Sequence, residues 1–481
     1  MAVTAFRVQN FMGFEDSGWI EMRPIMLLLG RNSSGKSAVI RSLLLLWQSL
    51  ESQDGSGALL FVKDNGYDFG SYQEIVYDHD LANEFSFWFR CRFDQKAGHP
   101  FLKGAHEALT SLISSAREAL DERTVIVRLI VGLDTRTQLP SVTGLELFDK
   151  EGDAIIRAKA RRVGDTDPMT WEFSSDFFNL LDDQQAEIWP FAEILTRRGF
   201  LPGIRLIHQK DEDEPPDYGE PFHWVWHILR GIRHTVEEFL HRISYLGPLR
   251  SAPQRFYYIA GQGANTPERG QQFVRDLLQS GPESLEELNR WLASSCLGIR
   301  VNLNALDGQR TLYELRIEDG STENATPLST NVREVGFGLT QMLPVITEAF
   351  IAKPETTVIV EQPELHLHPR AQAELSDVFI AIANRGVHCL IETHSEHLLL
   401  RLRRRIAEAS SGRVAEGDSR HLLADDLVVY FVDRVDGTSY LEEIKIDLQG
   451  RMTSPPAFRG FFSDDLQEMA LLNQAILDAS K

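Results

Sequence analysis

Eight consecutive residues of the chain have the types and spacing of a loop that binds phosphate groups. They match the pattern G-x-x-x-x-G-K-[ST] and are Gly30, Arg31, Asn32, Ser33, Ser34, Gly35, Lys36 and Ser37. In such a loop the glycines let backbone N–H groups point at phosphate oxygens, the lysine adds a positive charge at the β- and γ-phosphates, and the serine hydroxyl binds Mg²⁺. An apolar segment at 25–29 precedes the loop and a helical pattern at 38–48 follows it. The sequence therefore predicts a site for a nucleoside triphosphate with Mg²⁺.

A phosphate loop of this kind needs a carboxylate at the end of a neighbouring strand, where the carboxylate holds Mg²⁺. Residues 356–361 are predicted to form that strand, because they are mostly β-branched and end in Glu361. A second predicted strand, 387–392, is followed closely by His394, whose imidazole could lie against a γ-phosphate. We therefore expect Glu361 and His394 to complete the site that the loop begins.

A glycine-containing segment supplies a further candidate site for an anion. Gly336 and Gly338 open a predicted helix over 336–352, and Gln341 lies in its first turns. The N-terminal end of a helix attracts phosphate groups through its unpaired N–H groups and its dipole. Each of these features alone is common in ordinary loops, whereas their order along one chain is specific.

Length, composition and charge limit the classes of protein that remain. A chain of 481 residues is too long for one small core, so two or three lobes are expected. An apolar content of 43% and a charged content of 25% are typical of soluble globular proteins, and no apolar run reaches the length that spans a bilayer. The first residues lack the pattern of a secretion signal, so we expect a cytoplasmic protein without membrane contact. A net charge of −21 argues against a surface that coats nucleic acid.

The elements outside the motifs follow from apolar periodicity. Strands are predicted at 3–11, 19–29 and 85–93, and mostly helical or irregular structure over 171–243. Further helices are predicted at 103–120 and 464–479. Four arginines lie on a predicted helix over 395–408, either as a solvated face or as a contact with nucleic acid or a partner: Arg401, Arg403, Arg404 and Arg405.

Taken together, the motifs resemble those of the ATP-binding-cassette (ABC) ATPases of the SMC, Rad50 and RecF type. More narrowly, they are similar to the ATPases related to the overcoming-lysogenization-defect (OLD) family. The resemblance is carried by 10–11, 30–37, 336–341, 361–369 and 392–395. The segment 245–250, with Pro253 and Arg255 after it, is similar to one found in the ATPases of bacterial antiphage systems such as Septu.

The resemblance implies an α/β fold, an ABC-type P-loop ATPase head with a mixed sheet, a large inserted α+β region and no long coiled coil. The N-terminal part of the head would occupy 1–80, including the phosphate loop (Walker A) and a Q-loop, and the inserted region would occupy 81–330. The C-terminal part of the head, with the signature segment, the Walker B strand and the switch histidine, would occupy 331–410. A hairpin and a helix would follow at 411–481.

The resemblance also implies how ATP and Mg²⁺ are bound. Two copies of the chain would form a homo-oligomer with ATP sandwiched between them. The phosphates would lie on the loop of one copy and face Gly336, Gly338 and Gln341 of the other. Gln73 would join Ser37 and Glu361 as a ligand of Mg²⁺. Arg250 and Arg255 would either reach phosphates or pair with carboxylates nearby.

The Walker B strand departs from the pattern of most relatives, which place a catalytic Glu directly after the residue that holds Mg²⁺. Here the two positions read Glu361-Gln362, and a glutamine side chain cannot accept a proton from attacking water. Either Glu364 or His394 takes over that role, or turnover is slow and ATP serves mainly to hold a closed dimer. We also note Met12 where many relatives carry a basic residue.

The ATPase is expected to act without a nuclease of its own. Relatives of the OLD family often carry a Toprim nuclease domain, but its Glu-Gly turn is missing here, and no His-Asn-His (HNH) cluster occurs. His366 and His368 are expected to shape a loop rather than to bind zinc. Two functions remain. The chain is either a sensor and regulatory scaffold for a separate HNH or Toprim nuclease in antiphage defence, or a RecF- or SMC-like ATPase that binds or clamps DNA.

Overall fold

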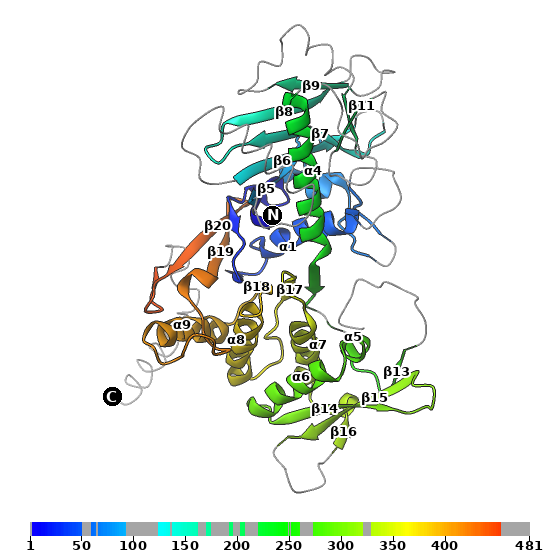
Figure 1. Ribbon diagram of the computed structural model, residues 1–481, viewed down its shortest axis with the longest axis vertical. Coiled ribbons are helices and arrows are strands. Elements are labelled where there is room, and N and C mark those ends of the chain that lie inside the picture. The colour runs from blue at the N-terminus through cyan, green and yellow to red at the C-terminus, as the bar shows by residue number, and fades with distance from the viewer. Residues whose placement is uncertain are drawn as a thin grey trace, which may run out of the picture. The chain divides into compact units, whose positions relative to one another are not determined.

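The structure is a computed structural model that describes thirteen segments of the chain (Figure 1). They are 2–50, 59–63, 66–92, 124–134, 137–161, 170–174, 192–195, 203–206, 220–248, 250, 252–259, 273–320 and 329–453. The chain divides into two compact units, each assembled from segments far apart in sequence. The first unit comprises Met1–Met22, Ser37–Arg242 and Val435–Tyr440, and the second comprises Arg23–Lys36, Ile243–Arg434 and Leu441–Lys481.

The second unit is built on a seven-stranded sheet in the order β12-β17-β18-β4-β19-β20-β21. The first five of these strands pair in parallel: β12 (Ile243–Leu246), β17 (Thr357–Glu361), β18 (His388–Glu392), β4 (Ile25–Gly30) and β19 (Leu427–Val435). The remaining two, β20 (Thr438–Ile446) and β21 (Met452–Thr453), pair antiparallel. Because parallel strands end at the same edge, the carboxyl ends of β4, β18 and β17 lie together there.

The central strands are apolar throughout because both of their faces are covered. Every residue of β4 and β17 is buried. Three helices lie in the crossover connections of this sheet: α7 (Phe337–Ile351), α8 (Pro369–Ala383) and α9 (Glu396–Ser410). Figure 1 shows α7 and α8 beside β17 and β18.

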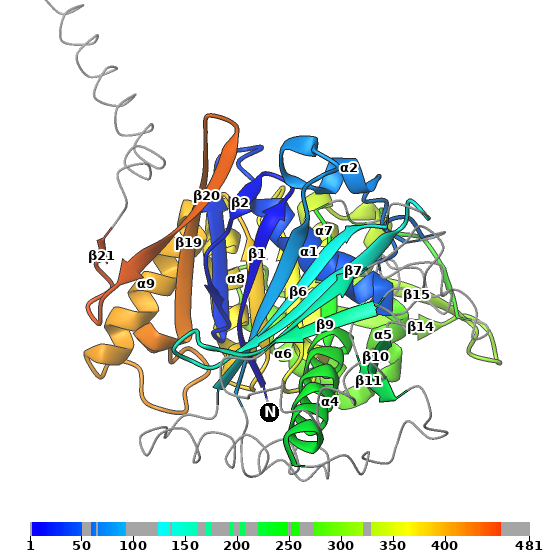
Figure 2. The same ribbon diagram turned by 90° about the horizontal axis from the view of Figure 1, so that it is seen from above.

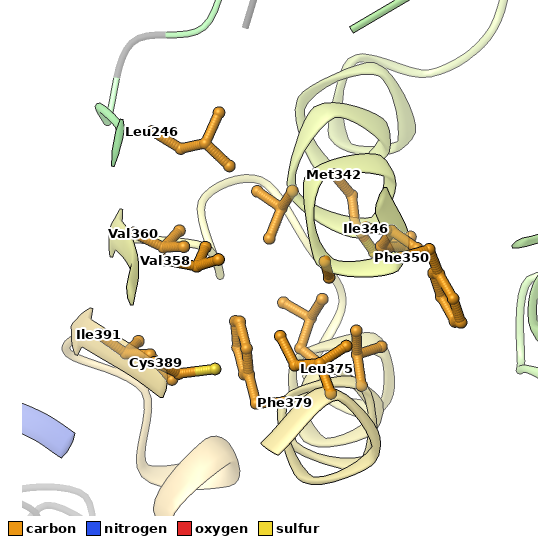
Figure 3. Close-up of a cluster of buried hydrophobic side chains, with 14 of the residues drawn as sticks. Leu246, Met342, Ile346, Phe350, Val358, Val360, Leu375, Phe379, Cys389 and Ile391 are labelled. Carbon is orange, nitrogen blue, oxygen red and sulfur yellow. The ribbon is translucent and has the colours of Figure 1, made fainter. Parts of the chain in front are cut away.

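The core between these helices and the sheet is continuous. Figure 3 shows Met342 and Ile346 of α7, together with Leu375 and Phe379 of α8, pointing toward the side chains of the two strands. Residues 340–350 of α7 are all buried. Proline at the first position of α8 and the Ser395 side chain, which caps α9 by accepting from Leu398 N, fix where those two helices begin.

A smaller antiparallel sheet completes the described part of the second unit. Its strands are β13 (Tyr257–Tyr258), β14 (Ile299–Ala305), β15 (Leu312–Asp319) and β16 (Ser329–Asn331). The helices α5 (Phe273–Gln279) and α6 (Pro282–Ser294) contribute Phe273, Leu288 and Leu292 to the same core as the large sheet.

The first unit contains an eight-stranded antiparallel sheet, whose strands run side by side in Figure 2. The main path is β2 (Phe14–Asp16), β1 (Ala2–Phe11), β5 (Phe85–Arg92), β6 (Thr124–Leu133), β7 (Pro140–Phe148), β8 (Ala154–Arg161) and β9 (Thr170–Ser174), and β3 (Ile20–Glu21) pairs with β1. This unit also contains α1 (Lys36–Leu50), α2 (Tyr72–Ile75), the 3₁₀ turn Tyr77–His79, α4 (Glu220–His241) and the pair β10 (Ala192–Leu195) and β11 (Gly203–Leu206).

The predicted α/β fold class is confirmed: the chain has a mixed sheet, a loop between β4 and α1, and an inserted region of strands and helices. The described segments contain no long coiled coil. None of the helices in the described part of the chain combines the length and apolar composition that crossing a membrane requires.

One prediction of an element was wrong, and another missed short strands. The strand predicted over 19–29 is two strands, β3 and β4, which belong to different sheets, because the chain bends at Pro24, whose ring removes an N–H donor. Within 171–243, helix α4 is present, but β9, β10 and β11 are strands, since β9 extends the sheet of the first unit by pairing with β8. The helices predicted at 103–120 and 464–479 lie outside the described residues.

Candidate functional site

The loop after β4 has a backbone that only glycine permits at its two ends. Gly30 has φ 154° and Gly35 has φ 112°, and Ser33 between them is also left-handed, with φ 60°. A Cβ on Gly30 would lie 2.2 Å from Val432 O, inside the van der Waals distance. The Ser34 hydroxyl is buried and has no hydrogen-bond partner among the described residues. The loop is therefore a tight backbone cradle with an unsatisfied polar atom in it.

Lys36 lies within this loop and is only 3% exposed. Its Nζ donates to Arg31 O at 2.7 Å and to Gly30 O at 3.0 Å, and it lies 3.9 Å from Glu392 Oε1. Burial lowers the pKa of Lys36, and the negative charges of Glu392, Glu364 and Glu361 act in the opposite direction. The ammonium group thus lies where the predicted phosphates would, held by the loop's own carbonyls.

The end of β17 places two of the predicted residues next to β18. Glu361 is 9% exposed and accepts a hydrogen bond from Tyr245 Oη of β12 at 2.7 Å. The backbone of Gln362 is left-handed, with φ 45°, and its N–H donates to Glu392 O at 2.7 Å. Glu361 and Glu392 are direct neighbours in the register of the two parallel strands. The pairing of β17 with β18 therefore fixes the backbone positions of Glu361, Gln362 and Glu392.

The structure brings Glu364 and His394 together. The backbone N–H of His394 donates to Glu364 Oε1 at 2.7 Å, and the Thr393 side chain also hydrogen-bonds this carboxylate. The other oxygen of Glu364 and Nε2 of His394 are both buried without a partner among the described residues. Burial raises the pKa of Glu364, and it lowers the pKa of His394, an effect that the positive charge of Lys36 increases. The His394 imidazole is therefore neutral near pH 7.

Arg250 is buried and forms hydrogen bonds within its own unit. Its guanidinium is 7% exposed and donates to Glu361 O at 2.8 Å, while Gln341 Nε2 donates to Arg250 O at 3.2 Å. Burial lowers the pKa of Arg250 to about 10. Arg255, by contrast, is half-exposed and forms an ion pair with Glu334 at 2.8 Å. Of the two arginines, Arg250 joins β17 to α7, and Arg255 lies at the surface.

Two glycines lie at the start of α7, and only one of them has room for a side chain. A Cβ on Gly336 would meet nothing within 4 Å, whereas a Cβ on Gly338 would lie 2.3 Å from His366 O. Between them, Phe337 is 53% exposed, and its ring centroid lies 4.9 Å from that of His366. Gln341 is buried, so its side chain faces the interior of its own unit. Gly336 and Phe337 are exposed, whereas Val335, Gly338 and Leu339 are only partly exposed.

Two predicted ligands of Mg²⁺ belong to the first unit. Ser37 follows Lys36 directly in α1, and Gln73 lies in α2. Their roles at the site therefore stay predictions. Among the residues that the structure describes, no three His, Cys, Asp or Glu side chains are grouped to hold a metal ion. Mg²⁺ in phosphate sites is usually bound by one or two carboxylates together with the phosphates, and a carboxylate such as Glu361 suits that role.

Sequence reasoning assigned no role to Glu392 or to Tyr245. The signal for Glu392 was present, since the predicted strands 356–361 and 387–392 both end in glutamate. Tyr245 lies on β12, a strand of four residues that was not predicted. Of the buried atoms without a partner among the described residues, the Ser34 hydroxyl and Nε2 of His394 can donate to the oxygens of a triphosphate, whereas the oxygen of Glu364 is an acceptor and suits a donor such as water.

Comparisons with known proteins agree with this description at the level of the fold. A family model described as "AAA domain, putative AbiEii toxin, Type IV TA system" matches residues 299–401. No curated protein matches the chain. The matched residues include α7, β17, α8 and β18, and they do not include the loop at 30–37.

Three solved structures of SMC heads align with most of the chain. The SMC head bound to the C-winged helix domain of ScpA has 10% identity and a TM-score of 0.41, with 92% of this chain and 98% of that chain covered. The SMC head domain from Thermotoga maritima has 10% identity and a TM-score of 0.39, covering 93% and 100%. The Smc head with an extended coiled coil bound to the C-terminal domain of ScpA, derived from Pyrococcus furiosus, has 8% identity and a TM-score of 0.39, covering 92% and 96%. At these TM-scores the superposition carries no argument about function.

Proposed function

We propose that the chain is an ATPase that binds ATP with Mg²⁺, hydrolyses it slowly and dimerises on ATP. The observation that carries this proposal is the position of Lys36, buried in the loop after β4, bonded to two loop carbonyls and facing carboxylates at the ends of β17 and β18. A buried ammonium whose hydrogen bonds go to carbonyls of its own loop can exchange them for phosphate oxygens without leaving its place.

The residues of the site have separable tasks in this proposal. Lys36 and the N–H groups of the loop hold the β- and γ-phosphates, and the neutral His394 places Nε2 where it can hydrogen-bond a terminal phosphate. Glu361 and Ser37 would hold Mg²⁺, which when bound neutralises charge on the phosphates. Glu364 holds the His394 backbone in position through its 2.7 Å hydrogen bond.

Slow hydrolysis follows from the chemistry of position 362. General-base catalysis contributes typically about 10²–10⁴-fold to a rate, and an amide cannot accept the proton. Gln362 occupies the place directly after Glu361, and its N–H is tied to Glu392 O. A carboxylate at another position must therefore supply this contribution, or the ATP-bound state is long-lived.

The wider role that we propose is a sensor and regulatory scaffold for a separate nuclease, of the HNH or Toprim type, in bacterial antiphage defence. The resemblance to OLD-related and Septu ATPases supports this role. The description of the matching family model also names a putative AbiEii toxin and a Type IV TA system. The alternative is a RecF- or SMC-like ATPase that binds or clamps DNA, which the motif order supports equally.

The ATPase proposal is tested by nucleotide binding and by a single-turnover experiment with Lys36→Met as the control. The methionine keeps the apolar stem of the side chain and removes the charge. We expect the wild type to bind ATP, to cleave it at well below the roughly 10 s⁻¹ that is the median turnover of enzymes, and Lys36→Met to bind at least about tenfold more weakly. Equal affinity of the two proteins for ATP would refute the assignment of the site.

The wider role is tested by co-purification with the product of the adjacent gene. Recovery of a nuclease in an ATP-dependent complex would support the scaffold. Tight ATP-dependent binding of DNA by the chain alone, without that partner, would support the DNA-binding alternative.

A further inference from the structure

The ends of β17 and β18 present a glutamate pair whose second member has no role in the function proposed above. Glu361 is the expected ligand of Mg²⁺, and its direct neighbour in register is Glu392. Both side chains are almost fully buried, at 9% and 4% exposure. Burial of two neighbouring carboxylates is costly unless positive charge or a ligand compensates it, so their presence at one sheet edge calls for a function.

Glu392 lies closer to the expected γ-phosphate than its position in the sequence suggests. Its Oε1 is 3.9 Å from Lys36 Nζ, the atom that such loops place at the β- and γ-phosphates. Among the charged groups that act on Lys36, Glu392 exerts the largest effect, ahead of Glu364 and Glu361. Glu392 therefore faces the phosphate end of the site from β18.

The backbone joins Glu392 to the position where the usual base is missing. Gln362 N–H donates to Glu392 O at 2.7 Å, which makes these two residues neighbours across the gap between the strands. Most relatives carry a carboxylate at the position of Gln362, directly after β17. In this chain Glu392 carries a carboxylate at the end of the adjacent strand, β18. Glu364 is a weaker candidate, because one of its oxygens already accepts from the His394 N–H and it holds that loop in place.

We propose that Glu392 is the general base of ATP hydrolysis in this chain and replaces the carboxylate that position 362 lacks. Glu392 takes one proton from water as the water oxygen bonds to the γ-phosphorus of ATP. The bond from that phosphorus to the β,γ-bridging oxygen breaks, ADP leaves with the electron pair, and inorganic phosphate is formed. This inference rests on the proposed ATPase function.

The test uses the full chain, three variants that change Glu392, the comparison variant Glu364→Gln and one control. Glu392→Gln removes the carboxylate with little change of shape, and Glu392→Asp withdraws it by one methylene. Gln362→Glu combined with Glu392→Gln returns a carboxylate to the usual position. Glu416→Gln, which removes an exposed glutamate, is the control for loss of one charge. ATP affinity, the single-turnover rate and the identity of the bound nucleotide are measured for each.

We expect Glu392→Gln to cleave ATP at least about 100-fold more slowly than the wild type, in line with loss of a general base. It should bind ATP at least as tightly, because one negative charge facing the phosphates is gone, and the nucleotide recovered from it should be ATP. The double variant should recover at least tenfold of the lost rate. Glu416→Gln should behave as the wild type. If Glu392→Gln loses its thermal unfolding transition, Glu392→Asp decides, with slower cleavage and retained binding as the expected result.

The failures are distinguishable. Absence of ATP binding by the wild type would overturn the ATPase function itself. Binding without any cleavage by the wild type would overturn only the assignment of a base. Cleavage by Glu392→Gln within threefold of the wild type would also overturn it, with Glu392 then serving only as a counter-ion of Lys36. Loss of cleavage with retained binding in Glu364→Gln, but not in Glu392→Gln, would move the base to Glu364.

Discussion

At the scale of single residues, charge placement around Lys36 determines the state of its neighbours. His394 is half-shielded by burial and senses the positive charge of Lys36, and both effects lower the pKa of its imidazole. A neutral imidazole can donate or accept one hydrogen bond at Nε2, whereas an imidazolium would add a second positive charge beside the ammonium. A buried lysine together with a neutral histidine suits a site that binds a phosphate group.

We predict that His394 titrates below the ordinary histidine value of 6.5 and that Lys36→Met moves its midpoint upward, since the positive charge is removed. Because the folded pKa is below that of the unfolded chain, the contribution of His394 to stability is full above about pH 6.5 and declines as pH falls toward the folded value. NMR of ¹³C-labelled histidine measures both midpoints, with His394→Asn used to assign the signal. An unchanged midpoint in Lys36→Met would contradict the electrostatic explanation.

The residues of the site were predictable where the chemistry is contiguous in sequence. The loop from Gly30 to Ser37 carries its own pattern, and Glu361 follows a strand that composition alone reveals. The proximity of Glu392 to Lys36 is set by the order β17-β18-β4, which no local pattern specifies. Arg250 and Arg255 are similar in sequence context, and only packing makes one of them an interior link and the other a surface ion pair.

At the scale of elements, the helix that begins at the glycine segment is held by a close backbone contact. Gly338 leaves no room for a Cβ against His366 O, whereas Gly336, the N-cap of α7, has open space around it. The two glycines therefore serve different purposes, although the sequence pattern treats them alike.

We predict that Gly338→Ser destabilises the fold by about 1–3 kcal/mol, because its side chain must displace backbone in a packed region. Gly336→Ser is the matched control and should change stability by less than about 0.5 kcal/mol, since serine is a favourable N-cap. Denaturant unfolding of each variant measures the difference. Equal losses in the two variants would show that the His366 contact does not limit α7.

The arginine cluster of α9 binds the helix to its own unit. Arg401 and Arg405 both pair with Asp377 of α8, at 2.6 and 2.7 Å, and Arg403 Nε donates to Gly450 O at 2.8 Å. The prediction allowed a solvated face or a contact with nucleic acid or a partner, but Arg401 and Arg405 are poorly exposed and link α9 to α8 instead.

Asp377→Ala is predicted to cost about 1–3 kcal/mol of stability, because it leaves the poorly exposed guanidinium of Arg401 without its carboxylate and takes from Arg405 one of its two carboxylate partners, the other being Glu408. Arg404→Ala removes an exposed pair with Glu408 and should cost less than about 0.5 kcal/mol. Thermal unfolding distinguishes the two. If both variants unfold at the same temperature as the wild type, these ion pairs do not stabilise the fold and the arginine cluster acts only as a solvated face.

Most long elements could be read from the sequence, and the failures have a common cause. Helices α7 and α9 and strands β17 and β18 were predicted within a residue or two, because each has one strong apolar pattern. β12 was missed because it has only four residues and is stabilised by pairing with β17. β9 likewise depends on its neighbour β8, so tertiary pairing determined its structure.

At the scale of the whole molecule, the glycine segment is unusual because it exposes a large aromatic side chain on a chain with a net charge of −21. Phe337 is an exposed aromatic residue between two glycines, and Glu334, three residues before it, forms a half-exposed ion pair with Arg255. Exposed aromatic residues and arginines are enriched at the centres of protein interfaces. In the proposed dimer this surface would face the nucleotide bound by the other copy.

We predict that the wild type shifts from monomer to dimer on addition of ATP and Mg²⁺ under conditions of slow cleavage. Phe337→Ala should raise the dissociation constant of this dimer at least about tenfold, because losing an interface anchor costs about 1.4 kcal/mol or more. The matched control is Leu400→Ala, which removes an exposed apolar side chain from α9. Sedimentation across a concentration series gives the dissociation constants, and nucleotide affinity at low protein concentration shows whether the loop of each copy is intact. In the proposed dimer the phosphates would contact the loop of one copy and the glycine segment of the other, so Lys36→Met should abolish dimerisation through loss of nucleotide, whereas Phe337→Ala should weaken it with nucleotide still bound. A monomer in the presence of ATP for the wild type, or a dimer equally strong in Phe337→Ala, would exclude the sandwich through this surface.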